Sequence, residues 1–293
     1  MTVYDETQLI LHKYKIQANK SLGQNFLIDD NVIDGIIHNS NIDEHDLIIE
    51  IGPGLGVLTN RLLQEANNVI AVELDKRMVN ILQDRFKQNL NGEEKNKLKI
   101  INQDILKINL NQLISEKRKK TKISKVKVVA NLPYYISTPI IMKLLENRLD
   151  IDEIIVMVQK EVADRLTART GTRIAGAITY AVEYYAEATS ILKVPKESFV
   201  PSPKVESEVI KLKVRKNEKI QVMDEKLLFN IISKSFMQRR KTLSNSLSNN
   251  NIMSDKADVK KMFIELGMDE NVRGENLTLE QFGKIVDYIS NKK

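Results

Sequence analysis

The glycine-rich segment Glu50-Ile51-Gly52-Pro53-Gly54-Leu55-Gly56 is the feature that most constrains the fold of this 293-residue chain. A short apolar run, Asp46-Leu47-Ile48-Ile49, comes before it, and a helical pattern begins at Val57. A strand, a glycine turn and an amphipathic helix in this order form the first unit of a doubly wound α/β domain. Glycine permits the sharp turn and lets a ligand approach the main chain. We therefore expect a ligand site where this strand ends.

The spacing of the glycines narrows the kind of ligand. The dinucleotide fingerprint G-x-G-x-x-G would require glycine at position 57, where this chain has Val57. The pattern present is G-x-G-x-G led by Glu50, which is typical of S-adenosylmethionine (SAM) sites. A SAM-binding enzyme is therefore favoured over a dehydrogenase.

Two acids follow the next two predicted strands. Glu73 ends the run 68–73, and it lies 21 residues after Gly52, the separation expected of a carboxylate that binds a ribose diol. Asp75 is the alternative, but we expect it to cap a helix over 76–88. Asp104 follows the strand 98–102, where it could accept a hydrogen bond from an adenine amino group while Ile105 packs on the ring. A helix cap is an equally open interpretation of Asp104.

The stretch Asn131-Leu132-Pro133-Tyr134 ends a fourth strand, 126–130. Pro133 fixes the backbone and removes an amide donor, so the local carbonyls are presented as acceptors. The Asn131 side-chain carbonyl and the Leu132 backbone carbonyl could both accept from one exocyclic amino group, which would then attack an electrophilic methyl. This chemistry depends on orientation more than on a strong base.

Tyr134 could stack on the ring that carries this amino group. Stacking requires a base outside a helix, so the substrate would be a flipped or unpaired nucleotide. Phe199, between two β-like runs over 188–194 and 208–214, could supply a second stacking face, or it could be a core residue of an edge hairpin.

Composition limits the partners. The 45 Lys and Arg against 39 Asp and Glu give a net charge of +6, which permits a polyanion partner. A lysine-rich run over 115–127 is either a solvated loop or a phosphate contact, and the Ser- and Asn-rich tract 244–251 is a candidate mobile loop. The chain has no cysteine, and its three histidines have no metal-ligand spacing, so we expect no metal site. We expect a cytoplasmic protein that does not span a membrane, since no apolar run approaches about 18 residues.

The chain divides at a polar linker near 215–224, and a purely helical pattern follows it. We expect an α/β catalytic domain over 1–216, with a mixed seven-stranded Rossmann-like sheet, and a small all-α domain over 222–293.

Motifs along most of the chain resemble those of the ribosomal RNA adenine dimethyltransferase family, and within it those of the bacterial small-subunit enzymes. The resemblance spans roughly residues 16–290. The segments that carry it are Gln24–Leu27, Glu50–Gly56, Asn131–Ile136, Met157–Ala163, Phe199–Val205 and Gln238–Leu243.

The resemblance implies a SAM-dependent, metal-free enzyme that dimethylates N6 of two adjacent adenosines. These lie in the 3′-terminal hairpin loop of 16S rRNA, in the small (30S) ribosomal subunit, and the enzyme is expected to be a monomer. It implies rRNA contacts from the C-terminal helices and from Arg239, Arg240 and Lys241, with a helix surface as the alternative for these three. The catalytic residues would be Asn131, Leu132, Pro133, Tyr134 and Phe199, and the SAM contacts Asn25, Leu27, Gly52, Gly54, Glu73, Asp104, Ile105 and Asn131.

One stretch departs from the family pattern. The family usually has Tyr-Gly-x-Leu-Ser where this chain has Ile174-Ala175-Gly176-Ala177-Ile178-Thr179. The substitution leaves the details of the substrate channel open but not the reaction.

Other functions fit the sequence less well. A sister branch methylates 23S rRNA and confers macrolide resistance, but Asn-Leu-Pro-Tyr-Tyr and Met-Val-Gln-Lys-Glu-Val-Ala favour the 16S enzymes. DNA adenine or protein glutamine methyltransferases more typically have Pro-Pro-Tyr after the Asn or Asp. A non-catalytic assembly or transcription factor could have lost Glu73 or Asn131, and both are present.

Overall fold

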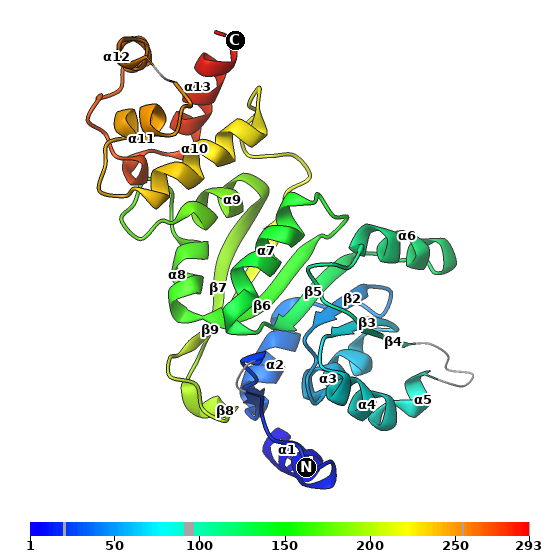
Figure 1. Cartoon of the computed structure of the whole chain (residues 1–293). Coiled ribbons are helices and arrows are strands. Elements are labelled where there is room, and N and C mark those ends of the chain that lie inside the picture. Colours follow the sequence, from blue (N-terminus) through cyan, green and yellow to red (C-terminus); the bar gives the residue numbers. More distant parts are fainter. Residues whose placement is uncertain (20–21, 91–96, 254, 293) are drawn as a thin grey trace. The chain divides into compact units, whose positions relative to one another are not determined.

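The computed structural model describes residues 1–19, 22–90, 97–253 and 255–292, and the chain forms two compact units (Figure 1). The first unit contains residues 1–163 and 189–214, and the second contains 164–188 and 215–293. The expected boundary between the domains 1–216 and 222–293 lies near the break between the two units at Arg215. The segment 164–188, which was expected in the first domain, clusters with the C-terminal helices in the second unit.

A seven-stranded sheet has the strand order β4-β3-β2-β5-β6-β9-β7, and a two-stranded sheet pairs β1 with β8. The strands β2 to β6 run parallel to one another, and β9 lies antiparallel to β6. The expected mixed seven-stranded sheet is confirmed. The strands are β1 Phe26–Leu27, β2 Leu47–Ile51, β3 Asn68–Glu73, β4 Leu98–Asn102, β5 Val126–Asn131, β6 Glu153–Gln159, β7 Ala186–Val194, β8 Phe199–Val200 and β9 Ser207–Val214.

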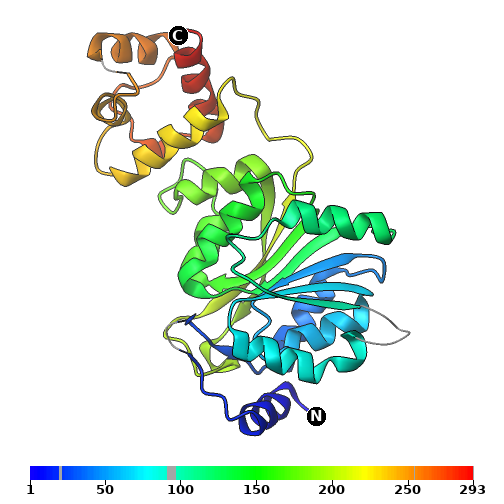
Figure 2. The ribbon, with the colours of Figure 1, turned by 45° about the vertical axis from the view of Figure 1, so that its right-hand side comes forward.

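Helices cover the sheet of the first unit. In Figures 1 and 2, α3 and α4 lie on one side of β2, β3 and β4, and α6 lies on the other. Strands β2 and β3 are buried along their whole length, as expected of parallel strands covered on both faces. The helices that begin in this unit are α1 Val3–Lys13, α2 Asp30–Ser40, α3 Val57–Glu65, α4 Lys76–Arg85, α5 Lys87–Leu90, α6 Leu110–Lys120, α7 Ser137–Glu146 and α8 Lys160–Thr167.

The second unit is built around Tyr180. Its ring packs edge-on against Phe282 at a centroid distance of 5.3 Å, and it also contacts Phe236. Its hydroxyl donates a hydrogen bond of 2.6 Å to the Leu277 carbonyl, which joins α9 to the C-terminal helices. The helices are α9 Ala177–Tyr185, α10 Glu225–Met237, α11 Leu243–Asn249, α12 Lys256–Glu265 and α13 Leu279–Ser290.

Two segments that were interpreted as loops are helical in part, and to that extent the loop interpretation is wrong. The lysine-rich run begins inside α6, whose start is capped by the Asn109 side chain accepting from the Gln112 amide. The tract 244–251 lies largely in α11, where Leu243 and Leu247 are buried one turn apart. In both segments a few periodic apolar residues outweigh a polar composition.

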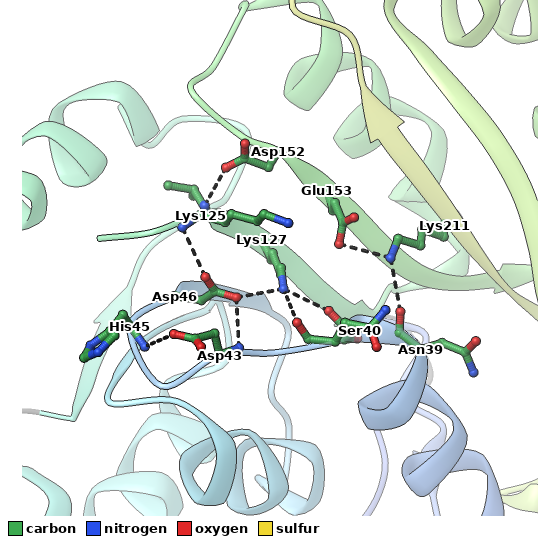
Figure 3. Close-up of polar contacts among 12 residues, drawn as sticks. Asn39, Ser40, Asp43, His45, Asp46, Lys125, Lys127, Asp152, Glu153 and Lys211 are labelled. Atoms are coloured by element: carbon green, nitrogen blue, oxygen red, sulfur yellow. Dashed lines mark hydrogen bonds and ion pairs between the residues drawn. The ribbon is translucent and has the colours of Figure 1, made fainter. Parts of the chain in front are cut away.

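A buried ion pair fixes the amino ends of β2 and β5. The Lys127 Nζ lies 2.7 Å from Asp46 Oδ2, and both side chains are at most 2% exposed. The same Nζ donates to the carbonyls of Ser40 and Asn41, at 3.0 and 2.5 Å (Figure 3). Lys127 is therefore neither a solvated residue nor a phosphate contact, contrary to the two interpretations of the lysine-rich run.

We expect Lys127→Met to lower the free energy of unfolding by about 3–5 kcal/mol, because it leaves the Asp46 carboxylate buried without its cation. Urea denaturation followed by circular dichroism measures the change. Lys125→Met is the matched control: the Lys125 side chain is exposed, and only its backbone amide bonds to Asp46. Equal stability of the two variants would contradict a structural role for the buried pair.

Candidate active site

A pocket lies at the carboxyl ends of β2, β3, β4 and β5 and holds about 1100 Å³ of space, some of it open to solvent. Strand order reverses between β2 and β5, and open α/β sheets bind ligands at such a position. The pocket brings together most of the residues proposed from sequence. Those that line it are Asn25, Leu27, Gly52, Gly54, Glu73, Asp104, Ile105, Asn131, Leu132, Pro133 and Tyr134.

The glycine turn has the conformation that its sequence requires. Gly52, Gly54 and Gly56 have φ values of 69°, 55° and 81°, in the left-handed region that disfavours other residues. A Cβ on Gly56 would also lie 2.6 Å from Leu82 Cδ2, so a side chain cannot fit there. A Cβ on Gly52 would lie 3.7 Å from Pro133 Cδ, which shows that the two motif loops are in contact.

Glu73 is held in the pocket by main-chain donors. Its carboxylate accepts from the Gly54 amide at 3.2 Å and from the Asp75 amide at 2.8 Å. Burial raises the pKa of Glu73, and the backbone hydrogen bonds oppose this shift. A carboxylate offers about four acceptor positions, so the two amides leave capacity for a ribose diol. Asp75 caps α4 by accepting from the Arg77 amide, as expected.

Glu50 is a pocket residue to which sequence analysis gave no role beyond leading the glycine turn. Its side chain is 1% exposed and accepts a hydrogen bond of 2.6 Å from the Thr59 hydroxyl. Burial, with a smaller contribution from the charge of Glu73, raises the pKa of Glu50 to about 8. The raised pKa favours the protonated form of Glu50 beside Glu73.

Asp104 stabilises a turn and does not cap a helix of the structure. One of its carboxylate oxygens accepts from the Leu106 amide at 2.9 Å, and its backbone carbonyl accepts from the Lys107 amide at 2.9 Å. The turn presents Asp104 and Ile105 to the pocket.

Asn131 ends β5, and the nitrogen of its side-chain amide points toward the Asn25 carbonyl. The Asn131 Nδ2 donates to the Asn25 carbonyl at 3.5 Å, so the amide oxygen is available as an acceptor. The Leu132 amide donates to the Met157 carbonyl of β6 at 3.2 Å, which anchors the loop that follows.

Tyr134 is half-buried and fixed at its hydroxyl. This hydroxyl forms a 2.6 Å hydrogen bond with the Ser207 hydroxyl at the start of β9. Burial raises the pKa of Tyr134, so the phenol stays neutral. Because the hydroxyl is anchored, the ring keeps one orientation at the wall of the pocket.

The N-terminal segment contributes more than sequence analysis expected. Leu22, Gly23, Gln24 and Phe26 all line the pocket, although only Asn25 and Leu27 were proposed as contacts. Gln24 Nε2 donates to Asp75 Oδ2 at 3.1 Å, which joins the segment to α4. No periodic pattern in the sequence indicates this packing.

Phe199 does not line the pocket. It is 2% exposed, belongs to the core, and pairs with Leu27 between β8 and β1. Phe199 is therefore a core residue, the second of the two alternatives, and it offers no open face on which a base could stack.

Arg239, Arg240 and Lys241 are exposed residues of the second unit. Arg239 Nη2 donates to the carbonyls of Arg173 and Ala175 at 3.0 and 3.1 Å, and the same guanidinium pairs with Glu275. Arg239 therefore also orders the segment in which the sequence departs from the family pattern.

Among residues 1–19, 22–90, 97–253 and 255–292, no group of three His, Cys, Asp or Glu side chains is arranged to hold a metal ion. In the same part of the chain, no helix combines the length and apolar character of a membrane span.

Known proteins of similar sequence agree with the kind of site that the geometry indicates. The family described as "Ribosomal RNA adenine dimethylase" matches residues 15–291. Relatives named "Ribosomal RNA small subunit methyltransferase A" are 43% identical in Alkaliphilus oremlandii, over 98% of this chain and 97% of that protein, and 45% identical in Lachnoclostridium phytofermentans, over 98% and 97%.

Solved structures show the same fold. A dimethyladenosine transferase from Plasmodium falciparum has a TM-score of 0.73 and 27% identity, over 91% of this chain and 98% of that one. The 23S rRNA methyltransferase ErmE has a TM-score of 0.64 and 20% identity, over 91% and 100%. The resemblance found in the sequence motifs is thus confirmed: the chain belongs to the ribosomal RNA adenine dimethylase family and is a SAM-dependent rRNA adenine dimethyltransferase.

Proposed function

We propose that this enzyme transfers two methyl groups from SAM to N6 of each of two adjacent adenosines in the 3′-terminal hairpin loop of 16S rRNA, within the small ribosomal subunit. The observation that carries the proposal is a single pocket lined by the glycine turn, Glu73, Asp104 and the loop 131–134. Relatives at 42–45% identity are named small-subunit methyltransferases, whereas the 23S enzyme is similar at 20%. This difference supports the small subunit as the substrate.

The cofactor would lie along the carboxyl ends of β2, β3 and β4. Glu73 would accept from the ribose hydroxyls, and the Asp104 carboxylate would accept from the adenine amino group while Ile105 packs on the ring. The opposite side of the cofactor would contact Asn25, Leu27, Gly52 and Gly54, which leave room for the amino-acid part of SAM. SAM bound there supplies an electrophilic methyl group on a sulfonium.

The target adenine would lie against the loop at the end of β5. The Asn131 Oδ1 and the Leu132 carbonyl would accept the two hydrogens of the N6 amino group, which orients its lone pair toward the methyl. Pro133 would keep the carbonyls in this position, and the Tyr134 ring would stack on a base that has left its helix. Each transfer would break the sulfur–methyl bond, leave S-adenosylhomocysteine as the product, and release one proton from N6 to solvent. After the first transfer one N–H remains, so one acceptor can still orient the nitrogen for the second transfer.

Binding of the rRNA would involve the second unit. Arg240 and Lys241 are exposed and cationic, which suits contacts to phosphate groups. Arg239 would act beside them, through the segment 173–175 that it orders. We propose that a monomer in the cytoplasm recognises the subunit in this way, with the first unit catalytic and the C-terminal helices binding rRNA.

We expect Asn131→Ala to lower kcat by roughly 100-fold or more, because an amino group that has lost one acceptor is misoriented toward the methyl. SAM binding should weaken only slightly. Transfer of labelled methyl groups to small subunits that lack the modification measures the rate, and calorimetry measures SAM binding. The control is Asn111→Ala, at an exposed position of α6. A rate for Asn131→Ala within a few-fold of the wild type would rule out the proposed orientation of the amino group.

We expect Glu73→Gln to raise the Kd for SAM by about 10- to 100-fold, because hydrogen bonds to a charged acceptor contribute roughly 1.5–3 kcal/mol. Titration calorimetry gives the Kd, and thermal unfolding shows whether the variant keeps its fold. Glu65→Gln, at an exposed position of α3, is the control. An unchanged Kd in Glu73→Gln would remove Glu73 from the cofactor site.

A further inference from the structure

Lys143 of α7 holds the turn that forms the Asp104 wall of the pocket. Its Nζ donates to the carbonyls of both Ile105 and Ile108, each at 2.8 Å. The side chain is not itself part of the pocket lining, and the residue is half-buried. Lys143 therefore contacts the turn from behind, on the side away from the space where a ligand would lie.

The rest of the turn explains why this contact matters. The amides of Leu106, Lys107 and Ile108 all donate to Asp104, through its carboxylate or its backbone carbonyl. These bonds define the curvature of the turn but do not attach it to the neighbouring helix. The Lys143 ammonium makes that attachment, because one cation bridges two carbonyls three residues apart.

The charge of Lys143 also acts on the site. Burial lowers the pKa of Lys143, and the Asp104 carboxylate opposes this shift by raising it. The ammonium and the carboxylate therefore attract each other across the turn. The Asp104 carboxylate itself is oriented by its hydrogen bond from the Leu106 amide, and a carboxylate suits a donor such as an amino group.

Helix α7 also carries the loop for the target base. It begins at Ser137, directly after Asn131–Ile136, and the Ser137 hydroxyl donates to the Tyr134 carbonyl at 3.2 Å. Lys143 follows six residues later, or roughly 9 Å along the helix axis at 1.5 Å per residue. One rigid helix thus connects the loop 131–136 at its start with the Asp104 turn at Lys143.

We propose that Lys143 is a positioning residue that fixes the Asp104 turn for recognition of the cofactor adenine, and that α7 thereby sets the distance between the cofactor and the target base. The proposal rests on the proposed function, which puts the cofactor adenine at Asp104 and Ile105. It adds a residue that touches neither cofactor nor substrate and acts through the backbone of the turn.

The test uses two ligands that differ at one group. S-adenosylhomocysteine has the 6-amino group, and S-inosylhomocysteine has a carbonyl oxygen there. Lys143→Met keeps the length of the side chain but has no donor or charge. We expect it to raise the Kd of S-adenosylhomocysteine about 10-fold. The Kd of S-inosylhomocysteine should change little, so the preference of the site for adenine decreases. Lys143→Arg can still donate to both carbonyls and should recover part of this preference.

Lys107→Met is the matched control, because Lys107 is exposed on the same turn and belongs to no wall of the pocket. It should leave the Kd of both ligands unchanged. In the complete reaction, Lys143→Met should raise KM for SAM and also lower kcat at saturating SAM, since the methyl is then less well aligned with the base.

Two results would overturn the proposal. One is an unchanged preference for adenine in Lys143→Met. The other is an equal loss of affinity for both ligands, which would make Lys143 a purely structural residue. Asp104→Ala separates this from failure of the proposed function. If Asp104→Ala weakens the binding of S-adenosylhomocysteine and Lys143→Met does not, only the role proposed for Lys143 is wrong. If Asp104→Ala has no effect on either ligand, the position assigned to the cofactor adenine is wrong.

Discussion

The parallel pairing of β2 with β5 is the constraint on which the site depends. Leu47 pairs with Val126 and Ile49 with Val128, so the two strands end at the same edge of the sheet. The glycine turn and the loop 131–134 leave the strands there and come into contact through Gly52 and Pro133. At the opposite end of the same two strands, the Lys127–Asp46 ion pair connects their amino ends. A slip of one residue would change which buried side chains pack on each face of the sheet and would shift the two loops relative to each other.

The electrostatics of the pocket suit a cationic cofactor. Glu50 and Glu73 are both buried, and burial raises the pKa of each. Uncompensated acids in a pocket are unfavourable, and a nearby positive charge stabilises their ionised forms. A sulfonium bound beside them would supply such a charge, whereas a neutral or anionic ligand would not. If the cofactor binds as proposed, the two acids would favour a cationic ligand in addition to the role proposed for Glu73 at the ribose.

Much of this site was predictable because parallel strands are simple to align from sequence. Glu73, Asp104 and Asn131 each lie at or within two residues of the end of a predicted strand, so a parallel sheet alone brings them together. The N-terminal segment was less predictable, since its packing over the pocket depends on contacts such as Gln24 with Asp75. Phe199 illustrates the same limit, because the pairing of β8 with β1 buries it and no local pattern shows that pairing. Helix α6 was missed because its polar composition concealed its few buried residues, Leu110 and Ile114.

The most direct test of the account is to locate the methyl groups that this enzyme adds. The purified chain and SAM are incubated with unmethylated small subunits and, separately, with large-subunit rRNA, and the digested rRNA is analysed by mass spectrometry. The account predicts N6,N6-dimethyladenosine at two adjacent positions near the 3′ end of 16S rRNA, and none in large-subunit rRNA. Methylation confined to 23S rRNA, or SAM binding with no methyl transfer to either rRNA, would contradict it.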